Sequence, residues 1–163
     1  MSEFIYDRTI EDVMYAINTR AKIATQGFDS LTLEEAADYM DGLKGALNIS
    51  DLQRIEINTN FIAERLTTSG YPTEVTAIKT WQRTNMPIAS ELERIRADVA
   101  TLRGKLTLRS SVPSIPNTLV PADFNKINIL ERIQYEVMQA VNAVTSMLVH
   151  INTFRLGQGG YLT

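Results

Sequence analysis

The feature that most constrains the fold is a long series of apolar residues within positions 129–154. Their spacing alternates between three and four residues, which places the side chains on one face of a helix. This seam consists of Leu130, Ile133, Val137, Ala140, Val144, Met147, Ile151 and Phe154. We therefore predict a long helix over these positions, with Asn128 as its N-cap and Glu131 completing a capping box.

The same segment carries no Asp, Glu, Lys or Arg from 137 to 154, although a helix with one face in water normally carries charges there. A membrane span is the alternative, but polar residues are too frequent in this segment for hydrocarbon. We expect a second copy or a neighbouring protein to cover the back of the helix. The contact candidates there are Met138, Thr145 and Val149.

A second helix is predicted near the N-terminus, from Thr9 to about Gln26, where Gly27 suits the left-handed residue that follows a helix. Its apolar positions are Ile10, Val13, Met14, Ile17, Ala21 and Ala24. The seam of the C-terminal helix is expected to pack against apolar faces around Ile17, Ile62 and Val99, because those faces are available within the chain.

Two more capping boxes predict helices that begin after Thr32 and Ser50, with Glu35 and Gln53 as the reciprocal partners. The first ends by 41–42, and the second ends before the breaker sequence at 69–72. The pattern at 73–82, which includes Trp81, indicates an extended connector.

Pro87 suits the first turn of a further helix, which ends near 104. Its apolar face consists of Leu92, Ile95, Val99 and Leu102. Three prolines break the segment that follows. Together these patterns predict an all-α, four- to five-helix bundle-like protein of one domain. Its parts are an N-terminal helical region (1–106), a Pro-broken linker (107–127), a long C-terminal helix on the same core (128–156) and a Gly-rich tail (157–163).

Composition and motifs argue against catalysis. The chain has no Cys and one His, His150, so thiolate chemistry and zinc sites of the usual ligand type are not expected. It has no GxSxG motif, and its Gly-rich segment has no following helix to bind phosphate. The net charge of −3 does not favour nucleic acid. We predict a non-enzymatic protein with no cofactor, metal, small-molecule substrate or membrane span, and the acidic N-terminus does not read as a signal peptide.

The stretch DGLKGALNISDLQRIE at 41–56 resembles a segment, similar to GLKGAYNYTDLNRVE, of minor structural proteins from the tail modules of phages and prophages of Gram-positive bacteria. The opening YDRT at 6–9 is similar to that family's N-terminal signature, and the order of later parts also agrees. Leu47, Ile49 and Gln53 depart from the family, which tends to have Tyr, Tyr and Asn there.

This resemblance implies a structural component of the virion tail, at the tip or baseplate, made in the host cytoplasm and present in a symmetric assembly. Other tail proteins and further copies of the chain are the implied partners. The alternative is a soluble helical adaptor or tail-assembly chaperone that is absent from the mature particle.

Two further groups of residues are candidates for partner contacts. Asp51, Arg54 and Glu56 are expected to point outward from the matched stretch, either as a solvated face or as a docking surface. Tyr161 and Leu162 are expected to anchor the C-terminal tail on another chain.

Overall fold

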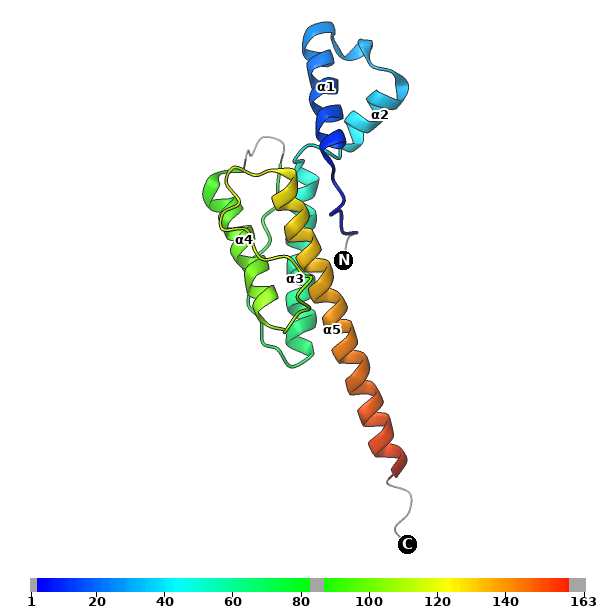
Figure 1. The fold of residues 1–163 in the computed structure, drawn as a ribbon, viewed down its shortest axis with the longest axis vertical. Helices are drawn as coiled ribbons and strands as arrows, with labels where there is room; N and C mark the ends of the chain where they lie inside the picture. The colour runs from blue at the N-terminus through cyan, green and yellow to red at the C-terminus, as the bar shows by residue number, and fades with distance from the viewer. Residues whose placement is uncertain (1–2, 83–86, 159–163) are drawn as a thin grey trace.

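The structure, a computed structural model, describes residues 3–82 and 87–158, with side chains as far as 147. Within these ranges the protein is all-α, as predicted (Figure 1). Its elements are α1 (Ile10–Gln26), the short 3-10 helix η1 (Phe28–Ser30), α2 (Leu33–Asp41), α3 (Ile49–Thr68), α4 (Ala89–Gly104) and α5 (Phe124–Gln158).

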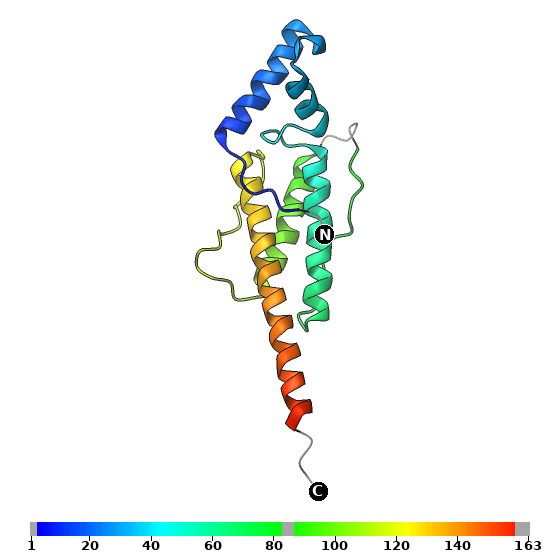
Figure 2. The same cartoon turned by 90° about the vertical axis from the view of Figure 1, so that its right-hand side faces the viewer.

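Helices α3, α4 and α5 pack against one another, and we call these three helices the bundle. They run in the same direction, so the extended segments between them return along the length of the bundle (Figures 1 and 2). Trp81, in the first of these segments, is buried in the core, as Val112 and Leu119 of the second are.

The bundle core contains the apolar faces predicted for its helices. Leu92, Ile95, Val99 and Leu102 are buried on α4, and the α5 seam is buried at Leu130, Ile133 and Val137. Ile62 of α3 lies in the same core. Each fully buried aliphatic side chain of this kind stabilises the fold by roughly 1.5–3 kcal/mol.

Met138 lies in this core and is 6% exposed, so the expectation that a partner covers it is wrong. Helices α3 and α4 both pack on α5. The buried surface of α5 is therefore wider than one seam, and the chain itself covers this part of the back.

Helices α1 and α2, joined by η1, stand away from the N-terminal end of the bundle, and we call these three elements the arm (Figures 1 and 2). Ile17 on α1 is 54% exposed, so the prediction that the α5 seam packs against it is wrong. Ile62 and Val99 share the core with that seam, as expected.

The predicted starts of α1 and α2 are confirmed. The side chains of Thr9 and Thr32 accept the backbone N–H of Asp12 and Glu35, and both carboxylates bond back to the cap residue. Such reciprocal caps satisfy backbone donors that a helix start leaves free. Gly27 follows α1 with φ +85°, as its position predicted.

Three predicted starts are wrong by a few residues. Helix α3 begins after Asn48, whose backbone N–H donates to Asp51 Oδ2, so Ser50 lies in the first turn. Helix α4 begins after Ile88, whose N–H is taken by Glu91, so Pro87 precedes the cap.

The third is α5, which begins at Phe124, because Asp123 accepts the N–H of Lys126 at 2.9 Å. Asn128 therefore lies inside the helix. The Pro-broken linker ends at 123, before α5 begins, rather than at 127 as predicted. At 35 residues α5 continues well beyond α3 and α4 (Figure 1). None of the described helices is both long and apolar enough to span a membrane.

Candidate protein–protein interface

The stretch at 41–56 forms the joint between the arm and the bundle. Gly42 takes φ +97°, and the backbone of α1 packs directly on Gly45. A Cβ at Gly45 would lie 2.0 Å from the carbonyl oxygen of Asp12, so a side chain there would displace the start of α1. The glycine at this position therefore fixes how closely the arm approaches the bundle.

Asp51 and Arg54 do not point outward as predicted, because both take part in a buried ion cluster. Arg8 Nη2 donates to Asp51 Oδ1 at 2.8 Å and to Glu131 Oε1 at 3.1 Å. Arg54 Nη2 donates to the same two carboxylates, at 2.6 and 2.8 Å. Two cations and two anions balance one another here, which is what burial of charges requires.

Glu131 shows most clearly what this cluster does. It is fully buried on α5, and its Oε2 accepts the backbone N–H of Ile5 at 2.8 Å. Asn128, one turn earlier, accepts from the N–H of Arg8 and donates to its carbonyl oxygen. Both residues therefore hold the N-terminal segment on the bundle, and neither caps α5.

Electrostatics within the cluster favour the charged form of Arg54. Burial alone would lower the pKa of Arg54, but hydrogen bonds and attraction from Glu131 and Asp51 outweigh it, so the pKa is raised above its usual value. Tyr6 and Phe4 pack on Tyr135 beside the cluster, and the Arg132 guanidinium lies over Tyr6. The segment before α1 is therefore firmly attached.

The prediction that Glu56 points outward is also wrong, since this residue is 4% exposed. It forms an ion pair with Arg94 of α4 and accepts the indole N–H of Trp81 at 3.2 Å. Its other oxygen accepts the backbone N–H of Lys79. Glu56 thus ties the 71–82 connector and α4 to α3. Gln53 supports the same connector by accepting the N–H of Trp81.

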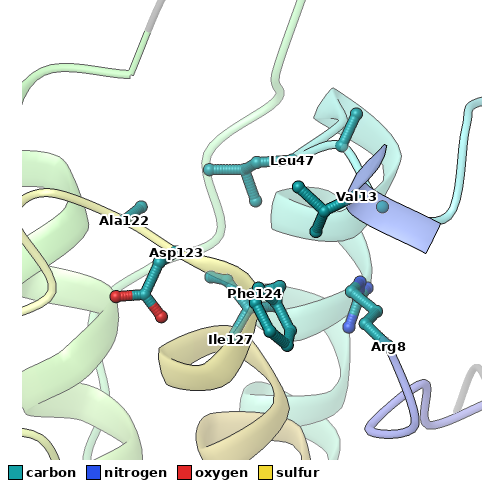
Figure 3. A pocket seen from close by; sticks show the side chains of 9 residues that line it. Arg8, Val13, Leu47, Ala122, Asp123, Phe124 and Ile127 are labelled. Carbon is teal, nitrogen blue, oxygen red and sulfur yellow. The ribbon is translucent and has the colours of Figure 1, made fainter. Parts of the chain in front are cut away.

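A cavity of about 260 Å³ lies at the joint (Figure 3). Val13, Leu47 and Phe124 line it, together with Arg8 and Asp123. The two charged residues already have partners, since Arg8 binds the ion cluster and Asp123 caps α5. The remaining lining residues have no polar side chain, whereas ligand sites usually place several polar groups around a small molecule.

The inner side of α1 is only partly apolar. Ala16 is buried in a small cluster with Leu43 and Ala46. Nearer the surface, Tyr15 donates to Asp38 at 2.8 Å and Lys22 to Glu35 at 2.6 Å. Thr19, on the same side of α1, is 1% exposed. At 3.6 residues per turn, the apolar seam of α1 falls on the opposite side and faces outward.

Exposed apolar residues therefore gather on the outer faces of the arm. On α1, Ile10, Met14 and Ile17 are each about half exposed, and Ala21 and Ala24 continue their spacing. On α2, Leu33 is 93% and Met40 64% exposed. Large apolar side chains left exposed in this number are typical of a binding site for another protein.

The free part of α5 gives a second exposed region. Met147 on the seam is 66% exposed, whereas Thr145 is half-buried, with its hydroxyl 3.1 Å from that of Ser69. The side chain of Val149 lies outside the described part, as do Tyr161 and Leu162, so their predicted contacts stay predictions.

Among the described side chains, no three His, Asp or Glu residues are grouped to hold a metal ion. Sequence reasoning missed the ion pairs of Arg8 and Glu131 and the outward orientation of the arm's apolar faces. A possible signal for the cluster was Glu131 itself, a charge directly beside Leu130 of the seam. Comparison with protein-family models, curated proteins and solved structures gives no match.

Proposed function

We propose that this protein is a non-enzymatic structural component of a bacteriophage tail, at the tail tip or baseplate. It acts by binding other tail proteins and further copies of itself in a symmetric assembly. The observation that carries the binding role is the arm, whose helices leave large apolar side chains exposed. The assignment to a tail rests on the resemblance of the 41–56 stretch.

The geometry supports a contact role because the bundle and the arm differ in how they bury their apolar residues. The bundle buries its apolar residues, and its Asp51, Arg54 and Glu131 form buried ion pairs that also include Arg8 of the N-terminal segment. The arm leaves large apolar side chains in water, which costs about 25 cal/mol for each Å² left unburied. A partner that covers those faces recovers that free energy on assembly.

The alternative is a soluble adaptor or tail-assembly chaperone, which would use the same exposed faces to hold a tail protein before assembly. Mass spectrometry of purified particles separates the two functions. A structural component is present at a fixed copy number in mature virions. Absence of the chain from mature virions would instead favour the chaperone.

A matched pair of variants tests whether the arm makes the contact. Leu33→Glu places a charge on the outer face of α2, at the first helical position, where the helix dipole favours an acid. Ile78→Glu places the same charge on an exposed residue of the bundle's connector. We expect Leu33→Glu to fold but to be lost from particles, and Ile78→Glu to be retained. Equal incorporation of both variants would contradict a contact through α2.

A further inference from the structure

The seam of α1 has the regular spacing of a helix–helix contact but no partner within the described chain. Ile10, Met14, Ile17, Ala21 and Ala24 alternate by four and three residues, the pattern that pairs helices in coiled coils. The three large members are 53%, 49% and 54% exposed. A second helix laid along this face would bury all of them.

Charge indicates which helix that is. Helix α1 contains two acidic and two basic residues, so it is neutral and two copies do not repel each other. By contrast, η1 and α2 carry Asp29, Glu34, Glu35, Asp38 and Asp41 and no basic residue. Two α2 faces would repel, and self-association through α2 is disfavoured. The neutral seam of α1 is the one suited to a second copy of the same chain.

The sizes of the seam residues set the direction of pairing. Large residues lie in the first half of α1 and alanines in the second half. An antiparallel arrangement places Ile10 of one copy over Ala21 of the other, and Met14 over Ile17. A parallel arrangement places alanine on alanine and leaves the second half poorly filled, which close packing disfavours.

We propose that two copies of this protein associate through their α1 seams, antiparallel and about a two-fold axis. In this register no two like charges face each other beside the seam, since Glu11 of one copy lies opposite Asn18 of the other, and Arg20 lies opposite Val13. Helix α1 begins beside the bundle and runs away from it (Figure 1). The two bundles therefore point in opposite directions, with the two α2 faces free for other tail proteins.

Sedimentation equilibrium of the full chain tests the association. We expect a reversible dimer whose dissociation constant rises about tenfold or more in Ile17→Glu, because a charge is then trapped in the contact. Gln26→Glu adds the same charge to an exposed position of α1 away from the seam and should leave the constant nearly unchanged. A chain that stays monomeric, or an Ile17→Glu variant that dimerises like the parent, overturns the proposal.

Disulfide trapping tests the direction and does not depend on the charged variant. The chain has no Cys, so only introduced thiols react. In the antiparallel dimer, Ile10→Cys mixed with Ala21→Cys forms a mixed disulfide. Neither variant bonds to itself, because like positions are about 16 Å apart at 1.5 Å rise per residue. A disulfide between two Ile10→Cys chains would mean parallel pairing and would overturn the proposed geometry.

This inference deepens the proposed function by naming one partner, and the two can fail separately. Particles that contain the chain, together with a pure chain that never dimerises, would overturn the α1 contact alone. A chain that dimerises but is absent from virions would overturn the structural role alone.

Discussion

The arm and the bundle are built from the same kind of helix, but the bundle buries its apolar side chains and the arm leaves large apolar side chains exposed. In the bundle, Leu102 and Ile133 are fully buried and Glu131 is paired with two arginines. In the arm, Thr19 is buried while Ile17 is half exposed. A single chain gains little by turning apolar residues outward, so the exposed faces of the arm are the ones that we propose a partner covers.

The largest expected effect comes from the buried ion cluster. Glu131→Ala removes one of the two carboxylates that balance Arg8 and Arg54 and should lower the free energy of unfolding by about 3–5 kcal/mol. The matched change outside the bundle is Lys44→Ala, which removes exposed pairs with Asp7 and Asp12. It should cost about 0–1 kcal/mol. Urea unfolding measures both, and similar costs would contradict the distinction between buried and exposed ion pairs.

A pair of isoleucine truncations compares the two regions directly. Ile133→Ala removes a fully buried side chain and should cost about 2–5 kcal/mol, because it leaves a cavity in the core. Ile17→Ala removes a half-exposed side chain and should change stability by no more than about 0.5 kcal/mol. Thermal and urea unfolding at low protein concentration measure the difference. A large cost at Ile17 would contradict the outward orientation of the α1 seam.

A smaller effect is expected at the start of α2. Thr32→Ala removes a side chain that accepts the N–H of Glu35 and should weaken α2 by about 1 kcal/mol. Ser50→Ala, in the first turn of α3, removes no cap and serves as the control. Hydrogen exchange of the α2 amides should accelerate only in the first variant. Unchanged exchange there would show that the cap does not stabilise the arm.

The smallest effect concerns pH. Hydrogen bonds from Thr118, Arg96 and the N–H of Leu119 lower the pKa of Glu93 to about 2, from an ordinary value of 4.5. A lowered pKa in the folded state means that the unfolded chain binds the proton more readily. Stability from Glu93 is therefore present above about pH 4.5 and lost as pH falls toward 2.

The test of this effect compares thermal unfolding of the parent and Glu93→Gln across that range. Glu93 is exposed enough for solvent to screen it, so we expect a modest loss of stability with falling pH that the variant lacks. Parallel curves for the two proteins would contradict a role for Glu93 in holding the linker on α4.

The sequence predicted what depends on near neighbours. Thr9 and Thr32 each find their capping partner three residues away, and the faces of α4 and α5 follow from regular spacing. Helices α3 and α5 start earlier than predicted, because Asn48 and Asp123, rather than Ser50 and Asn128, form the hydrogen bonds to their first turns. Such choices between nearby capping residues are decided by geometry that spacing does not give.

The candidate site was harder to predict, because its contacts join distant parts of the chain. Arg8 and Glu131 are 123 positions apart, so nothing near Asp51 or Arg54 indicates that these charges are buried together. The α1 and α5 seams have the same spacing, yet one faces outward and the other forms the core. Periodicity shows that a helix has an apolar face but does not show what covers it.

The central claim is that the apolar seam of α1 faces outward, and thiol labelling tests it most directly. Ile17→Cys and Thr19→Cys are two residues apart on α1, at side chains 54% and 1% exposed. In solution too dilute for association, we predict that the thiol at position 17 is alkylated about as fast as a free thiol and that the thiol at 19 reacts much more slowly. Fast alkylation at 19 with protection at 17 would contradict this account of the arm.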